Sequence, residues 1–135
     1  EVLGGRRILV AEDNLVNQMV ITGMLKKLDI AIEMAPNGLI AVERYAQDPL
    51  RWDLILMDCE MPELDGYAAT GRIRQLEQEQ NLRPVPIVAL TAHALREQQQ
   101  RCISAGMDEY LAKPLTFERL KQMLVQQFCR NGARN

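Results

Sequence analysis

Short apolar runs alternate along the chain with longer segments whose apolar residues recur every three or four positions. A run of four or five apolar residues is typical of a strand that is buried on both faces of a parallel sheet. Strands are predicted at residues 8–11, 31–35, 54–57, 87–90 and 109–112. The second of these has the weaker pattern, and the fifth is short.

A helix is predicted after each strand. The first follows Asn14, a residue that favours the N-cap position, and Val16, Val20 and Met24 then mark one apolar face. The next three helices are predicted at residues 39–46, 65–78 and 95–105, and Thr116 is predicted to cap the last one. Strands that alternate with helices in this way predict an α/β fold, with a parallel sheet covered by helices on both faces.

The composition indicates one compact domain. The chain has 135 residues, of which 47% are hydrophobic and 25% charged, as in an average globular domain. Sixteen basic residues against eighteen acidic ones leave no positive surplus for nucleic acid. No segment approaches the ~20 apolar residues of a membrane span, and the start of the chain lacks a signal-peptide pattern. We therefore expect neither nucleic acid nor a membrane as a partner of this domain.

The chain ends and the cysteines suggest a domain from a larger intracellular protein. We expect the domain to occupy residues 6–129, with residues 1–5 and 130–135 as linker ends. The initial Glu1 indicates either a fragment of a longer chain or a processed protein. Three cysteines without metal-binding spacing indicate a reduced, cytoplasmic domain. A domain at the cytoplasmic end of a membrane-bound parent protein would also fit this expectation. We interpret Cys59 as a space-filling residue rather than a reactive thiol.

Polar residues whose side chains can take part in catalysis or ligand binding follow four of the predicted strands. Glu12 and Asp13 follow the first strand, Asp58 the third, Thr91 the fourth and Lys113 the fifth. In parallel α/β sheets ligands bind beyond the carboxyl ends of the strands, so these side chains are expected to converge. Each of them alone has an ordinary explanation as a loop residue. The whole set at four strand ends favours a functional site.

Three converging carboxylates require either that one of them stays protonated or that a cation lies among them. Like charges about 4 Å apart repel by roughly 4 kcal/mol at an effective dielectric of about 20. Oxygen ligands in an open site suit Mg²⁺, and Lys113 adds a fixed positive charge. Such an arrangement neutralises a transferring phosphoryl group, and a carboxylate can itself become an aspartyl phosphate. Asp58 is the candidate nucleophile because its strand is the most apolar.

The chain resembles a response-regulator receiver domain over residues 7–128. The resemblance is carried by Glu12–Asp13–Asn14, by residues 56–62 with Asp65–Gly66, by Leu90–Thr91–Ala92 and by Lys113–Pro114–Leu115. It is strongest to the C-terminal receivers of hybrid sensor histidine kinases. It implies a flavodoxin-like fold with five helices and a five-stranded parallel sheet in the order 2-1-3-4-5.

The resemblance also implies a role for each motif residue. Asp58 is the implied phosphoacceptor, and the implied Mg²⁺ ligands are Asp13, Asp58, the backbone carbonyl of Glu60 and, through water, Glu12. Thr91 would hold a phosphoryl oxygen and Lys113 would neutralise its charge. Tyr110 would be the switch aromatic that moves with Thr91, and a cis bond before Pro114 would orient the loop. The implied partners are a histidine kinase domain, a histidine phosphotransfer protein, or both. The domain would catalyse its own phosphorylation and dephosphorylation, without an independent substrate.

Two alternatives remain open at this stage. The fold could serve as an interaction module that is regulated by protein contacts without phosphorylation, although the complete site argues against it. A small hydrolase with an aspartyl nucleophile is the other, because Glu60 lies two residues after Asp58, where such enzymes carry an acid/base. His93, the only histidine, is interpreted as a loop residue that shapes access to the site rather than as a phosphoryl carrier.

Overall fold

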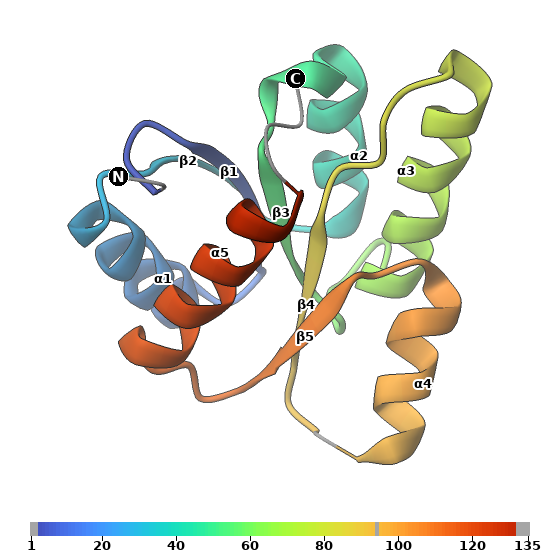
Figure 1. Ribbon diagram of the computed structural model, residues 1–135. Coiled ribbons are helices and arrows are strands. Elements are labelled where there is room, and N and C mark those ends of the chain that lie inside the picture. The colour runs from blue at the N-terminus through green and yellow to red at the C-terminus, as the bar shows by residue number, and fades with distance from the viewer. Residues whose placement is uncertain (1–2, 94, 132–135) are drawn as a thin grey trace.

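The computed structural model describes residues 3–93 and 95–131 and forms three layers, with a sheet between two layers of helices (Figure 1). Within these residues the strands are β1 (Arg7–Ala11), β2 (Ala31–Ala35), β3 (Leu54–Asp58), β4 (Ile87–Thr91) and β5 (Glu109–Ala112). The helices are α1 (Leu15–Lys27), α2 (Gly38–Gln47), α3 (Gly66–Gln80), α4 (Arg96–Ala105) and α5 (Phe117–Asn131), with a short 3₁₀ turn η1 (Pro49–Arg51). Of the predicted linker ends, residues 1–2 and 132–135 lie outside the described residues.

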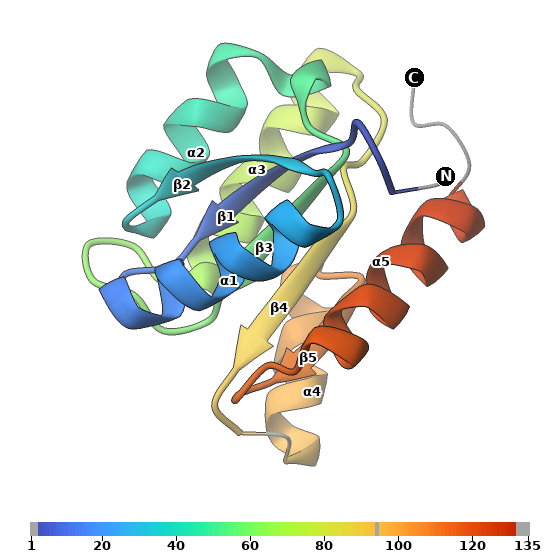
Figure 2. The same cartoon turned by 90° about the vertical axis from the view of Figure 1, so that its left-hand side faces the viewer.

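All described strands run parallel in the order β2-β1-β3-β4-β5, which confirms the order that the resemblance implies. Every residue of β3 and β4 is buried, as expected for strands with helices on both faces. Alternate strand residues supply two separate cores. Leu9, Ile55 and Ile87 pack on one side with α2, α3 and α4, while Val10 and Leu56 pack on the other with α1 and α5. Figures 1 and 2 show this division of the helices between the two faces.

The predicted apolar face of the first helix is wrong. Ile21 and Leu25 are the buried residues of α1, and Met24 is only partly buried against the same core. Val16 and Val20 are 67% and 44% exposed. The helix carries apolar side chains on more than one face, so its periodicity does not decide which face packs against the sheet.

The predicted helix ends agree with the observed caps. Asn14 accepts a hydrogen bond from the backbone N–H of Asn17, and Thr116 accepts one from the backbone N–H of Arg119. Gly106 follows α4 with a φ of 102°, the left-handed conformation that glycine tolerates best. Within the described residues, no helix combines the length and the hydropathy needed to cross a bilayer.

Candidate functional site

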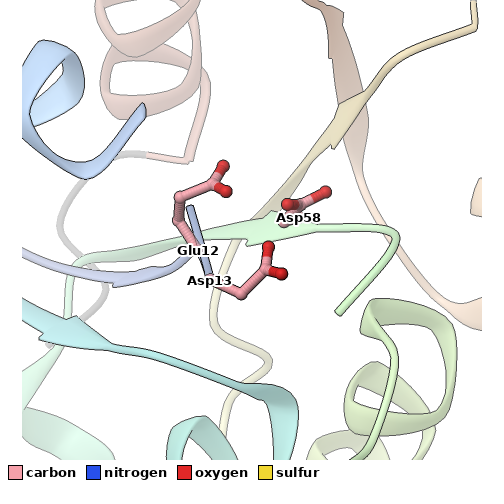
Figure 3. Close-up of side chains that lie close together, drawn as sticks. All are labelled: Glu12, Asp13 and Asp58. Carbon is pink, nitrogen blue, oxygen red and sulfur yellow. The ribbon is translucent and has the colours of Figure 1, made fainter. Parts of the chain in front are cut away.

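The carboxyl ends of the strands bring three acidic side chains together. Glu12 and Asp13 follow β1, and Asp58 is the last residue of β3. One carboxylate oxygen from each lies within 4.8 Å of the others, and Figure 3 shows the three side chains around one space. The predicted convergence of these residues is therefore confirmed.

Glu12 is fully buried, and hydrogen bonds to its side chain and its carbonyl fix its position. Its Oε2 accepts a hydrogen bond of 3.0 Å from the backbone N–H of Asn14, and its carbonyl accepts one of 2.6 Å from the side-chain amide of Gln18. Its Oε1 lies 3.3 Å from the Lys113 ammonium but has no hydrogen-bond partner among the described residues. The contact of Gln18 with a residue six positions earlier was not predicted, because nothing in the sequence pattern indicates it.

Asp58 lies between a cation and the acidic residues. Its Oδ2 is 3.0 Å from the ammonium of Lys113, and its Oδ1 accepts a hydrogen bond of 3.2 Å from the backbone N–H of Glu60. Burial raises the pKa of Asp58 to about 6, and the nearby Glu12 adds to the rise, although Lys113 and the Glu60 N–H oppose it. For Lys113, burial lowers the pKa, but the contacts with Asp58 and Glu12 outweigh it and leave the pKa raised. Lys113 therefore carries its charge at neutral pH.

The Thr91 hydroxyl is engaged with its own loop rather than with the carboxylates. It donates to the carbonyl of His93 at 2.8 Å and accepts from the backbone N–H of His93 at 3.1 Å. Tyr110 lies on β5, half-buried against the core under α2, α3 and α4. The bond between Lys113 and Pro114 is cis, as the resemblance implies.

The loop between β3 and α3 is compact. Asp65 caps α3 by accepting a hydrogen bond of 2.8 Å from the backbone N–H of Ala68. The backbone N–H of Gly66 donates to the carbonyl of Cys59 at 3.0 Å, which closes the loop at its base. Glu60, whose carbonyl is the implied metal ligand, is exposed near the start of this loop, two residues after Asp58.

Cys59 is a buried packing residue, as predicted. It is 3% exposed, and burial raises the pKa of its thiol to about 12. Its sulfur lies 4.0 Å from that of Cys102 on α4, a proximity that their spacing in the sequence did not reveal. The Cys59 thiol therefore stays protonated at neutral pH and lacks the character of a nucleophile.

Comparison with known families gives one match that covers most of the chain. The model described as the response regulator receiver domain matches residues 8–125. Among curated proteins, hybrid signal transduction histidine kinase M of Dictyostelium discoideum is 40% identical over 117 residues, which are 87% of this chain. The histidine-protein kinase BarA of Escherichia coli is 40% identical over 119 residues, or 88% of this chain. The chain spans only 5% and 12% of the lengths of these two relatives.

Solved structures give the same result. The magnesium-bound receiver domain of sensor histidine kinase PA1611 from Pseudomonas aeruginosa is 44% identical, with a TM-score of 0.82 and coverage of 93% of this chain and 99% of that one. A second match is to the co-crystal structure of the Saccharomyces cerevisiae phosphotransfer protein Ypd1 with the receiver domain of Ssk1. It has 29% identity, a TM-score of 0.91 and coverage of 98% and 95%.

Proposed function

The chain belongs to the response regulator receiver family, and on this premise we propose that Asp58 accepts a phosphoryl group from a phosphohistidine in a phosphorelay. The observation that carries the proposal is the placement of Asp58. It is a buried carboxylate at the end of a central strand, 3.0 Å from Lys113 and beside Glu12 and Asp13. The proposed domain extends over residues 6–129, and we expect it to act in the cytoplasm.

The acidic cluster has the donor chemistry of a magnesium site. Three carboxylates lie together, and the Lys113 ammonium pairs with two of them, Glu12 and Asp58. The buried Oε1 of Glu12 has no hydrogen-bond partner among the described residues. Hard oxygen donors in an open cleft suit Mg²⁺. We expect Asp13, Asp58 and the Glu60 carbonyl to hold the ion, with Glu12 acting through water. When bound, Mg²⁺ supplies positive charge that stabilises the transferring phosphoryl oxygens.

In the proposed reaction an oxygen of Asp58 attacks the phosphorus of the donor phosphohistidine. The oxygen–phosphorus bond forms as the nitrogen–phosphorus bond breaks, and the imidazole leaves and takes up a proton. Lys113 is already within hydrogen-bond distance of Asp58 and neutralises charge on the phosphoryl oxygens. Hydrolysis of the resulting aspartyl phosphate by water returns the domain to its starting state.

The switch step would release Thr91 from its present partner. Its hydroxyl donates to the His93 carbonyl in the structure, and we expect it to turn to a phosphoryl oxygen after transfer. Tyr110 is half-buried, and we expect it to move inward when Thr91 moves. These shifts bias a pre-existing equilibrium at the surface that α4, β5 and α5 form.

The proposed function is tested by the intact mass of the protein after incubation with Mg²⁺ and a small phosphodonor. We expect a gain of one phosphoryl group, located by peptide analysis at Asp58 and absent when EDTA removes the metal. A well-folded protein that gains no mass and binds no beryllofluoride with Mg²⁺ would instead be an interaction module. Sustained turnover of a generic phosphate ester would indicate a hydrolase.

A histidine kinase domain or a histidine phosphotransfer protein is the proposed phosphodonor. Apolar side chains at the start of α1 are exposed beside the site: Leu15, Val16 and Met19 are 73%, 67% and 74% exposed. A cavity of about 120 Å³ lies between α1 and the loop after β5, next to Glu12 and Lys113. Exposed apolar patches commonly mark contact surfaces, so a phosphohistidine-bearing helix is expected to dock here. The Ypd1–Ssk1 complex shows a receiver domain with such a phosphotransfer partner.

Met19→Asp is expected to slow transfer from a histidine-phosphorylated protein on the order of ten-fold or more, because it places a charge in the centre of the contact. Transfer from a small phosphodonor should be unchanged, since it does not require docking. Leu50→Asp is the matched control, because Leu50 is 68% exposed on η1, which precedes β3 and so lies at the amino-terminal ends of the strands, away from the site. Equal transfer rates from the protein donor in the two variants would contradict this docking surface.

A further inference from the structure

The start of α2 is fixed to the core. The side chain of Asn37 caps the helix by accepting a hydrogen bond of 2.9 Å from the backbone N–H of Ile40. Gly38, Ala41 and Tyr45 are buried. The Asn37 cap and the buried side of the helix therefore fix the first turn of α2. We expect an element that packs against this turn to adapt to its position.

Gly38 lies directly against the loop between β3 and α3. A methyl group at this position would overlap the carbonyl oxygen of Leu64 and would lie 2.9 Å from its carbonyl carbon and 3.2 Å from the carbonyl oxygen of Asp65. Real Cβ atoms essentially never approach other atoms within 3.0 Å. The backbones of α2 and the loop are thus in direct contact, and only glycine permits this contact.

The same loop is closed on its other side by a second glycine. A methyl group on Gly66 would overlap the carbonyl oxygen of Asp58, and the Gly66 N–H already donates to the Cys59 carbonyl. Within the loop, the backbone N–H of Leu64 donates to the Pro62 carbonyl at 2.7 Å. Residues 59–65 are therefore held between two backbone contacts, one with α2 and one with the end of β3.

We propose that Gly38 is a positioning residue for the phosphoacceptor site. Through the Leu64 carbonyl, its close contact sets the place of the loop and thereby of the Glu60 carbonyl and N–H, the latter 3.2 Å from Asp58. The metal-binding part of this inference rests on the proposed function. The placement of the loop does not, because it follows from backbone contacts alone.

Gly38→Ala tests the proposal. Because α2 is anchored in the core and the loop is partly exposed, we expect the loop to move. Calorimetric titration with Mg²⁺ should show a Kd raised on the order of ten-fold, the usual effect of losing a group that orients a metal ligand. The backbone amide resonance of Glu60 should shift in the metal-free protein. With a small phosphodonor, the Mg²⁺ concentration for half-maximal phosphorylation should rise more than the maximal rate falls.

The chain offers matched controls for this experiment. Gly23→Ala and Gly71→Ala add the same methyl group on helices α1 and α3, where nothing lies within 4 Å of it, and should leave both the Kd and the Glu60 resonance unchanged. Asn37→Ala removes the cap of α2 without placing an atom against Leu64. It should lower the melting temperature while the Mg²⁺ Kd stays as in the wild type. A Kd raised equally in Asn37→Ala would overturn the proposal, because helix stability would then explain the effect.

The remaining outcomes are also decisive. An unchanged Glu60 resonance and an unchanged Kd in Gly38→Ala would refute the positioning role. If the variant is unfolded in buffer, all the proteins are compared in trimethylamine N-oxide, which favours compact states. A chain that stays unfolded there counts against the proposal, which expects the loop to yield rather than the fold. Failure of the wild type to gain a phosphoryl group would overturn the proposed function, whereas the metal-free Glu60 resonance would still decide the loop placement.

Discussion

Replacing Asp58 with Asn is expected to abolish the phosphoryl mass gain and, in the same protein, to raise stability at neutral pH. The amide keeps the shape of the side chain but is a poor nucleophile, so no phosphoryl group should remain at this position. The gain in stability follows from burial, which raises the pKa of Asp58 to about 6 from an ordinary value of 3.8. The charged carboxylate is thus disfavoured in the fold.

The pH dependence distinguishes this cause from a general effect on packing. Between pH 3.8 and about 6 the folded state binds more protons than the unfolded state, so the stabilising contribution of protonated Asp58 is lost as the pH rises through about 6. Asn does not titrate. Solvent and ionic relaxation at this cleft reduce the effect, so Asp58→Asn should add about 1–2 kcal/mol to the free energy of unfolding at pH 7 and much less near pH 4.

Urea unfolding in metal-free buffer across this pH range measures the difference directly. The matched control is Asp53→Asn, which removes a carboxylate at the amino-terminal edge of β3, far from the acidic cluster. It should not show the same gain with rising pH. A difference between Asp58→Asn and the wild type that is constant with pH would contradict the buried-carboxylate explanation.

The strands were predictable from the sequence because their apolar runs are unambiguous. Residues 8–11, 54–57 and 87–90 are buried in β1, β3 and β4 within one residue of the predicted bounds. A strand that is covered on both faces leaves no choice of side. The strand order came from the resemblance, since apolar patterns identify strands but not their neighbours.

Helix α1 shows where the pattern fails. Val16 and Val20 lie at helical spacing, and so do Ile21 and Leu25, but only the second pair is buried. The buried face depends on how the helix lies against β1 and β3, which local periodicity does not contain. The exposed apolar face of α1 is the docking surface proposed above. The apolar residues that led to the wrong prediction of the buried face are therefore among those expected to contact the partner.

Long-range contacts between side chains were also not predictable from the sequence. Glu77 is buried on α3, where it accepts hydrogen bonds from the Tyr45 hydroxyl at 2.9 Å and the Val85 N–H at 2.7 Å and pairs with Arg74 at 2.8 Å. Nothing in its segment distinguishes it from exposed glutamates. The approach of Glu12, Asp58 and Lys113 was predictable because the carboxyl ends of parallel strands lie at the same end of the sheet.

Lys113→Met is expected to lower stability and phosphorylation together. The ammonium lies 3.0 Å from Asp58 and 3.3 Å from Glu12, both almost fully buried, and methionine of similar length removes the charge but keeps the packing. Breaking a buried pair by removing one partner costs about 3–5 kcal/mol. Since Lys113 is itself 24% exposed, we expect about 2–3 kcal/mol at pH 7.5 in metal-free buffer. The rate with a small phosphodonor should fall by roughly 10²–10³.

The sign of the pH effect follows from Asp58. Without Lys113, which lowers the pKa of Asp58, that pKa rises further above 6, so the carboxylate stays protonated to higher pH. The loss of stability relative to the wild type should therefore be small at pH 5 and grow towards pH 8. Lys113 itself, with a raised pKa, does not titrate in this range. Lys121→Met, which removes an exposed lysine from α5, should show neither loss.

In Lys113→Met, the affinity for Mg²⁺ shows whether Lys113 compensates the charge of the carboxylates, independently of its effect on the rate of phosphorylation. Lys113 and a divalent ion both compensate the same carboxylates, so removing the ammonium relieves the repulsion between the two cations. Lys113→Met should consequently bind Mg²⁺ more tightly than the wild type and recover more stability on its addition, although it takes up phosphoryl groups far more slowly. Weaker Mg²⁺ binding in Lys113→Met, measured by calorimetry, would show that Lys113 organises the acidic cluster rather than competing with the metal for it.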